Sequence, residues 1–238
     1  MRPRIICHMM SSIDGKLHPS RYSRPIGVDN GILHAHYDTT AATFHADGWI
    51  VGRITMAEVV NGEGAASLAT GELGPRSAWI GPDRGTSLAI AHDPDGRLRY
   101  ARPTVDTDRI VAVLGEHVSD AYLAELRENG VFHVFAGRDG RDLHKALDAL
   151  GSELGAQMLL LEGGATINAA YLQAGLIDEL SILLYPGIDG VAGVQSIFEG
   201  PKAACPGYGQ SLAFKAAEVL DGGMVWLRYT VSPASGVD

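Results

Sequence analysis

One turn of the chain combines a carboxylate with two glycines at a place suited to a ligand. Residues 159–166 read LLLEGGAT, so an apolar strand-like run ends in Glu162, and Gly163 and Gly164 open the next helix. Paired glycines let a backbone approach a ligand closely, and a helix start offers free N–H groups and positive potential. The pattern suits a pyrophosphate. Its alternative is a tight strand-to-helix turn that binds nothing.

A second turn carries side chains that suit phosphate. Gly52, Arg53 and Thr55 follow the apolar residues 49–51. An arginine guanidinium offers a forked pair of donors, and a threonine hydroxyl offers one more. The alternative is a surface arginine beside a threonine that caps a helix.

A third turn, residues 11–16 (SSIDGK), follows the first apolar run of the chain. Asp14 and Lys16 could handle a proton or an anionic substrate, or they could form an Asx turn and a solvated charge. All three turns come after the carboxyl end of a predicted parallel strand, where open α/β sheets bind ligands. We therefore expect the three turns to face one crevice.

Other kinds of site lack their sequence patterns. Neither GxGxxG nor GxxxxGK[ST] occurs, there is no GxSxG elbow, and neither cysteine has a flanking catalytic pattern. Three histidines fall on one predicted helix without metal-ligand spacing, so we predict no metal site; they are His34, His36 and His45. Four charged residues of the middle segment are interpreted as loop charges, namely Asp83, Arg84, Asp93 and Asp95.

The elements that would position these turns alternate between strand and helix. Strands are predicted at residues 4–11, 49–51, 87–92, 109–114, 131–136 and 157–161. Helices are predicted at residues 30–46, 119–129, 143–154 and 165–175, with a short one after Thr55. This alternation requires βαβ crossovers and a mainly parallel central sheet flanked by helices. Strand-like residues 179–184, 211–219 and 224–231 follow, and residues 220–223 (LDGG) predict an antiparallel C-terminal hairpin.

Length and composition limit the classes that remain. The chain has 238 residues, 46% of them hydrophobic, and 19 Lys+Arg against 28 Asp+Glu give a net charge of −9. The negative charge argues against nucleic-acid binding, and the lack of an apolar run of ~18 residues argues against a membrane span. The 2 cysteines, far apart in sequence, indicate a reducing cytoplasm. We predict one domain over residues 1–238, with an atypical insertion at 62–107 and a flexible tail at 233–238.

Three segments together resemble the riboflavin-biosynthesis reductase family. They are residues 2–17 (RPRIICHMMSSIDGKL), 47–55 (DGWIVGRIT) and 159–188 (LLLEGGATINAAYLQAGLIDELSILLYPGI). The family consists of pyrimidine reductases with a dihydrofolate-reductase-like α/β fold, in some bacteria fused behind a deaminase. The resemblance implies an NADPH-dependent homodimer. It also implies a reaction that opens a ribosylamino sugar on a pyrimidine 5′-phosphate and delivers hydride to C1′, giving a ribitylamino product.

The resemblance also assigns roles to residues. Gly52, Arg53 and Thr55 match the turn at the adenosine phosphates, and Met10 falls near the nicotinamide. The turn along the pyrophosphate is matched by Gly163, Gly164, Ala165 and Thr166. Asp14, in the loop over the reaction centre, and Glu162, a substrate-contacting carboxylate, are the two candidates for supplying the proton. The substrate contacts are assigned to Ser12, Lys16 and Glu162, and to Ser23, which aligns loosely.

The chain departs from the family after the second turn. Family members often continue with an acidic residue and a Pro-Leu-Thr-Arg-like run that helps to bind the substrate phosphate, whereas residues 56–62 here read MAEVVNG. Either other cationic side chains bind the substrate phosphate, or the substrate has no phosphate. The candidates for binding it are Lys16, Arg21, Arg24 and Arg76. Two alternatives stay open. The same fold and cofactor could act on a different pyrimidine, pteridine or carbonyl compound, or the chain could be a non-redox nucleotide-binding module.

Overall fold

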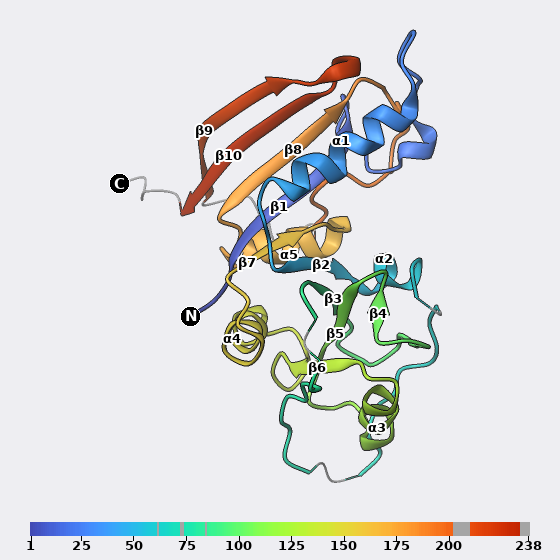
Figure 1. Ribbon diagram of the computed structural model, residues 1–238, viewed down its shortest axis with the longest axis vertical. Coiled ribbons are helices and arrows are strands. Elements are labelled where there is room, and N and C mark those ends of the chain that lie inside the picture. The colour runs from blue at the N-terminus through green and yellow to red at the C-terminus, as the bar shows by residue number, and fades with distance from the viewer. Residues whose placement is uncertain (61, 72–73, 84, 202–209, 234–238) are drawn as a thin grey trace. The chain divides into compact units, whose positions relative to one another are not determined.

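Strands, several of them buried and mostly apolar, form the framework of the chain, which is described here from a computed structural model. The structure describes residues 1–60, 62–71, 74–83, 85–201 and 210–233, so Cys205, Arg84 and the predicted tail beyond residue 233 lie outside it. The chain divides into two compact units, and neither is continuous in sequence (Figure 1). Unit 1 comprises Met1–Arg4 and Ala46–Leu159, and unit 2 comprises Ile5–His45 and Leu160–Asp238.

Unit 1 is built on parallel strands. β2 (Gly48–Gly52) pairs with β3 (Leu88–His92), β3 with β5 (Asp108–Leu114), and β5 with β6 (Phe132–Phe135), all in parallel. The two-residue strand β4 (Thr104–Val105) pairs with β5 in the antiparallel sense. Strands buried on both faces read as continuous apolar runs, which explains why these strands are recognisable in the sequence.

The start of each of three helices in unit 1 is explained by neighbouring residues. α2 (Arg53–Ala57) begins where β2 ends at Gly52. α3 (Asp120–Glu128) begins at a capping serine whose Oγ accepts the Tyr122 N–H, and α4 (Leu143–Leu154) begins at Asp142, whose carboxylate accepts the Lys145 N–H. α4 buries one apolar face and ends at Gly155, which has a left-handed φ of 74°. β7 (Met158–Leu161) then carries the chain from unit 1 into unit 2.

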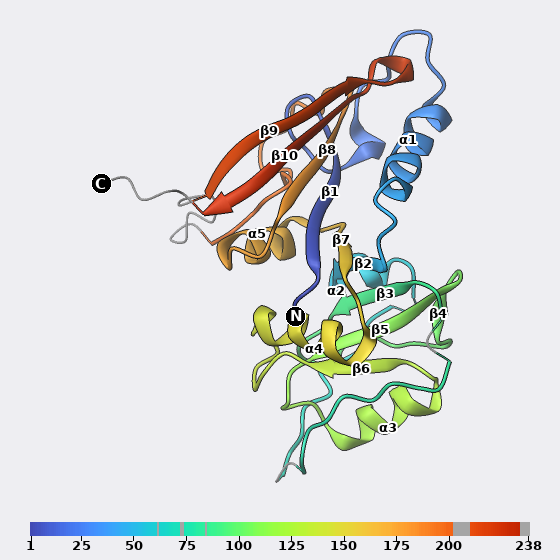
Figure 2. The same cartoon turned by 60° about the vertical axis from the view of Figure 1, so that its left-hand side comes forward.

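Unit 2 combines a parallel pair of strands with an antiparallel hairpin (Figure 2). β1 (Arg4–Ser12) runs parallel to β8 (Glu179–Tyr185), β8 is antiparallel to β10 (Val225–Pro233), and β10 is antiparallel to β9 (Gln210–Val219). The predicted turn at residues 220–223 is confirmed, because the short 3₁₀ segment η2 (Asp221–Gly223) joins β9 to β10. A second such segment, η1 (Pro19–Arg21), follows β1.

Two helices belong to unit 2. They are α1 (Asn30–Ala42), which is capped by Asp29, and α5 (Ala165–Gln173), which follows β7. A core cluster joins α1 to the strands and consists of Tyr22, Leu33, Leu183, Tyr185 and Met224. Met10 of β1 and Tyr37 of α1 pack against this cluster.

Most predicted elements lie within a few residues of the observed ones, and two boundaries differ. The helix predicted to reach residue 46 ends at Ala42. The hydroxyls of Thr39, Thr40 and Thr43 donate to backbone carbonyls three or four residues earlier, a pattern that competes with regular helix geometry, and His45 then takes a positive φ of 50°. The short helix predicted after Thr55 begins earlier, at Arg53, because Gly52 already has the extended conformation of an N-cap.

The described residues include neither a membrane-spanning helix nor a metal-binding cluster of side chains. No helix of the described part is long and apolar enough to cross a membrane. Within the same residues, no three His, Cys, Asp or Glu side chains are grouped so that they could hold a metal ion.

Candidate functional site

The turn after β7 presents a carboxyl and an uncapped helix start. Glu162 is half-buried, and Gly164 stands at the N-cap of α5, where a glycine has no side chain to bond to the first-turn N–H groups. Thr166 is exposed in that first turn. Free N–H groups and the positive end of a helix dipole attract anions, so this turn has the electrostatics of a phosphate site.

Gly163 gives this turn its shape. Its φ is +97°, a conformation that residues with a side chain rarely adopt, and a Cβ there would lie 3.0 Å from Met9 Cε. Next to it lies the side chain of Asn168, which is fully buried, donates from Nδ2 to the Ile197 carbonyl (3.0 Å) and has no partner for Oδ1. The backbone at Gly163 therefore requires glycine, as the paired glycines of the sequence suggest.

Asp14 is held by the backbone of a distant loop in the same unit. Its carboxylate accepts the Ser12 hydroxyl (2.7 Å) and the N–H groups of Asp189 (3.1 Å) and Gly190 (2.9 Å). These hydrogen bonds, led by that from Ser12, lower the pKa of Asp14 to about 2. Asp14 is therefore ionised at neutral pH.

The other predicted substrate contacts in this loop also have partners within unit 2. Ser12 Oγ accepts the Lys16 N–H (2.9 Å), and Lys16 Nζ donates to the Val194 carbonyl (3.1 Å). Ser23 Oγ accepts the Ile188 N–H (2.9 Å). These contacts tie the turn after β1 to residues 188–194, which follow β8.

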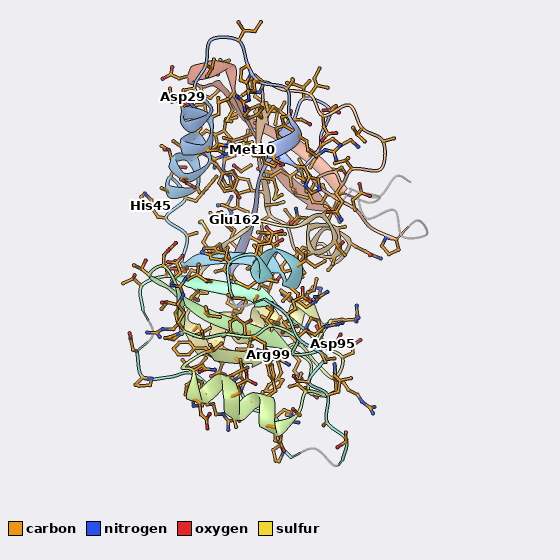
Figure 3. All side chains as sticks on the ribbon, turned by 90° about the vertical axis from the view of Figure 1, so that its right-hand side faces the viewer. Met10, Asp29, His45, Asp95, Arg99 and Glu162 are labelled. Atoms are coloured by element: carbon orange, nitrogen blue, oxygen red, sulfur yellow. The ribbon has the colours of Figure 1, made fainter. Side chains whose placement is uncertain are left out.

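Met10 and Glu162 both belong to unit 2, whereas Asp95 and Arg99 belong to unit 1 (Figure 3). The hydroxyl of Tyr37 connects this region to α1. It donates to the His8 carbonyl (3.0 Å), and burial together with the charge of Glu162 raises the pKa of Tyr37 well above its usual value. Tyr37 is a residue that the sequence patterns did not single out.

The second predicted turn lies in unit 1. Gly52 forms the N-cap of α2 without a side-chain cap, Thr55 is half-buried, and the Arg53 guanidinium forms an ion pair with Glu63. No sequence motif indicated Glu63. The structure thus brings Asp14, Ser12 and Lys16 together in one unit, with Met10 and the Glu162 turn in that same unit, and has Gly52, Arg53 and Thr55 in the other.

Asp93 corrects the interpretation of the middle segment as loop charges. It comes directly after β3, is fully buried and accepts the Leu98 N–H (2.8 Å) and the Tyr122 hydroxyl (3.3 Å) on one oxygen, while the other oxygen has no partner. Burial raises its pKa, and the nearby charge of Arg53 opposes that shift. A sequence pattern could have singled out Asp93, because it is a carboxylate directly after an apolar strand, as Glu162 is.

A comparison with protein-family models decides the family. The model of the RibD C-terminal domain matches residues 3–226. The chain belongs to the RibD C-terminal domain family. This confirms the family, the oxidoreductase class and the dihydrofolate-reductase-like α/β fold predicted from the sequence.

Named proteins from several organisms are similar to this RibD C-terminal domain. A 2,5-diamino-6-ribosylamino-4(3H)-pyrimidinone 5′-phosphate reductase of Methanothermobacter thermautotrophicus is 26% identical over 200 residues, which are 84% of this chain and 85% of that protein. A solved pyrimidine reductase-like protein of Corynebacterium diphtheriae is similar with a TM-score of 0.65 and 17% identity, covering 97% of this chain and 92% of that one. RibD of Acinetobacter baumannii has the same TM-score at 20% identity, and the match covers 97% of this chain but 58% of that longer one.

Proposed function

We propose that this chain is an NADPH-dependent reductase that converts the ribosylamino group of a pyrimidine 5′-phosphate into a ribitylamino group. The observation that carries the proposal is the turn after β7, where the Glu162 carboxyl is followed at once by the uncapped N-terminus of α5. One turn thus offers both a proton-transfer group and an anion site, which a reductase with a phosphorylated cofactor needs. The family membership supports the same reaction class.

The substrate undergoes one hydride and one proton addition. C1′ of the sugar gains a hydride, the C1′–O4′ bond breaks, and O4′ takes a proton, so the product carries an open ribityl chain. When bound, NADPH supplies the hydride. The protein has to orient the reacting groups and deliver the proton.

Of the two candidate carboxyls, Glu162 fits proton delivery better. With a pKa of about 2, Asp14 has no proton to donate at neutral pH, and its oxygens are engaged with Ser12 and the backbone of residues 189–190. We therefore assign Asp14 to holding the loop over the site, and Glu162 to giving the proton. Ser12, Lys16 and Ser23 are assigned to the substrate side.

The residues proposed for the cofactor fit an anionic dinucleotide. The backbone of residues 163–166 offers N–H groups to a pyrophosphate without interference from a side-chain cap, and Met10 is assigned to the nicotinamide. Gly52, Arg53 and Thr55 are assigned to the adenosine phosphates. Because Arg53 pairs with Glu63, binding a 2′-phosphate would require the guanidinium to exchange one anion for another.

The remaining sequence-based assignments belong to this proposal too. They are a single functional domain over residues 1–238, a homodimer, and a cytoplasmic enzyme that acts on a small molecule.

The test is an assay of NADPH oxidation with the ribosylaminopyrimidine phosphate as substrate. The reaction is monitored through the loss of the near-ultraviolet absorbance of NADPH. We expect turnover by the wild type and a loss of at least a hundredfold in kcat for Glu162→Gln, with the Kd of NADPH unchanged. Binding of NADPH without turnover would indicate that the same fold and cofactor act on a different substrate. No NADPH binding at millimolar concentration would favour the non-redox nucleotide-binding alternative.

A second measurement tests the cofactor assignments. Arg53→Ala should weaken NADPH more than NADH, because only NADPH carries the 2′-phosphate that the guanidinium is assigned to. Gly164→Asp should weaken both cofactors, since a carboxylate would stand against the pyrophosphate. Equal losses of the two cofactors in Arg53→Ala would refute the role of Arg53.

A further inference from the structure

One segment of unit 2 is bonded to both of the turns that the proposed function assigns to substrate and cofactor. We call this segment, residues 188–199 after β8, the strap. Near its start, the Asp14 carboxylate accepts the N–H groups of Asp189 (3.1 Å) and Gly190 (2.9 Å). The strap thereby holds the loop that follows β1.

The middle of the strap fixes Lys16. Lys16 Nζ donates to the Val194 carbonyl (3.1 Å), and the next N–H along the chain, that of Leu17, donates to the Gln195 carbonyl (3.0 Å). Lys16 also forms an isolated antiparallel bridge with Ser196. The ammonium group that is assigned to the substrate therefore takes its position from the strap, through its side chain and its backbone.

The far end of the strap is bonded to α5. The Glu199 N–H donates to the carbonyl of Ala165, the first residue of that helix (3.1 Å), and one turn later Asn168 Nδ2 donates to the Ile197 carbonyl (3.0 Å). Asn168 is fully buried, and its Oδ1 has no partner among the described residues. A carbonyl only accepts, so the amide must face Ile197 with its nitrogen. Because a buried amide is costly unless it is bonded, the contact with the strap is what stabilises this side chain.

We propose that Asn168 is a positioning residue that fastens the strap to α5 and so keeps Lys16 aligned with the turn after β7. The proposal rests on the proposed function, since it concerns the alignment of the assigned substrate group with the assigned cofactor turn. Asn168 itself is given no contact with either ligand, and it moves neither hydride nor proton.

A contact inside the strap shapes the end that Asn168 holds. The Ser196 N–H donates to Glu199 Oε1 (3.0 Å), and the Ser196 hydroxyl lies 3.0 Å from the same oxygen. These hydrogen bonds, led by that from the backbone, lower the pKa of Glu199, so its side chain is a carboxylate at neutral pH. The contact closes the turn that presents the Ile197 carbonyl to α5. Changing the exposed Glu199 therefore loosens the same end of the strap and leaves the sequence of α5 intact.

The first experiment follows amide hydrogen exchange in the full chain, without ligands, for Asn168→Leu and Glu199→Ala. Leucine has nearly the shape of asparagine but cannot donate to Ile197. We expect peptides that cover residues 13–17 and 188–199 to exchange at least fivefold faster in both variants, and peptides of β10 to keep their rates. The double variant should exchange no faster than the faster single variant, because both changes act at one end of the strap.

The matched control is Thr40→Val. It also removes a buried side-chain donor of unit 2, one bonded to the His36 carbonyl (2.7 Å), but in α1 instead of α5. The exchange of the strap should not change in this variant.

Kinetics test whether the fastening serves the reaction. Asn168→Leu should raise the KM of the ribosylaminopyrimidine phosphate about fivefold, the effect of one hydrogen bond between uncharged groups. The Kd of NADPH should stay within twofold, because the backbone N–H groups of residues 163–166 are unaltered. Thr40→Val should change neither constant, and Glu199→Ala carries both measurements if Asn168→Leu does not fold.

Three results would overturn the proposal: strap exchange at the wild-type rate in both variants, an unchanged KM despite faster exchange, or an equal rise of KM in Thr40→Val. A wild type that binds NADPH without turnover would refute the proposed substrate instead. The exchange rates then decide by themselves whether Asn168 fastens the strap, since they require no activity.

Discussion

Replacing Gly163 by alanine tests the turn after β7 most directly. Gly163 has a φ of +97°, and an added Cβ would lie 3.0 Å from Met9 Cε and 3.3 Å from Met9 Sδ. The thioether end of a methionine is flexible and can move by a few tenths of an ångström, so the larger cost is that of the backbone conformation.

The size of the effect follows from these two terms. Holding a non-glycine residue in such a conformation costs about 1–3 kcal/mol. For a chain of this size, each kcal/mol lowers the melting temperature by roughly 2–4 °C, so a cost of about 2 kcal/mol predicts a loss of roughly 4–8 °C. If the backbone instead relaxes to avoid this cost, the N–H groups at the start of α5 move, and the affinity for NADPH falls.

Two matched glycines separate these contributions. Gly193 has a φ of +77° with nothing within 4 Å of an added Cβ, so Gly193→Ala reports the backbone cost alone. Gly222 has a φ of +78°, and its Cβ would lie 2.8 Å from Val28 Cγ1 and 2.9 Å from Leu33 Cδ2, so Gly222→Ala adds a packing cost in the η2 turn.

The assay measures thermal unfolding by circular dichroism and NADPH binding by tryptophan fluorescence for all three variants. We expect every variant to lose stability, with Gly222→Ala losing most, and only Gly163→Ala to bind NADPH at least tenfold more weakly. A Gly163→Ala protein that is as stable as the wild type and binds NADPH equally well would refute the backbone argument. A destabilised one with unchanged NADPH affinity would refute the assignment of this turn to the cofactor.

Two further predictions concern buried charge and pH. Glu179 is fully buried and bonds to Arg228 Nε (2.7 Å) and Lys215 Nζ (2.7 Å), so Glu179→Ala, which leaves the mostly buried Arg228 guanidinium without its carboxylate, should cost about 3–5 kcal/mol in urea unfolding. The more exposed partner gives the contrast, and Lys215→Ala should cost no more than about 1 kcal/mol; equal losses would contradict the argument from burial. Burial lowers the pKa values of His8, His92 and His133 to about 4 in the folded chain. The unfolded chain then binds more protons between pH 6.5 and 4, so stability is complete above pH 6.5 and falls with acidification by up to about 1.4 kcal/mol per pH unit for each histidine. Urea midpoints that stay constant from pH 7 to pH 4.5 would show that these rings are not held neutral.

Much of the fold could be predicted because its signals are local. Apolar strands, capping residues such as Asp142 and the LDGG turn each depend on a few neighbouring residues, and the family segments coincide with them. The end of α1 could not be predicted, because three threonine hydroxyls turn to the backbone there without changing the pattern of apolar residues.

The candidate site divides in the same way. The glycine conformation at Gly163 and the helix start at Ala165 follow from short motifs. Three features depend on contacts between segments far apart in the sequence: the burial of Asp93, the neutral ring of His8 and the hydrogen bond from Tyr37 to the His8 carbonyl. Without those contacts, Asp93 looks like any loop charge, and Tyr37 looks like one more residue of an irregular helix.

The interrupted course of unit 2 sets an order of events during synthesis. The Ile5 N–H bonds to the Asp178 carboxylate, 173 residues later, so the first strand leaves the ribosome roughly 10–30 s before its β8 partner at usual rates of translation. The segment in between can close on itself during this wait, because Asp47 joins its two ends: the N–H of Asp47 donates to the Met158 carbonyl (2.8 Å), and its carboxylate accepts the Met158 N–H (2.9 Å). We therefore expect residues 46–159 of unit 1 to fold first during synthesis. Until β8 has been made, the apolar side chains of residues 5–9 stay exposed to other molecules.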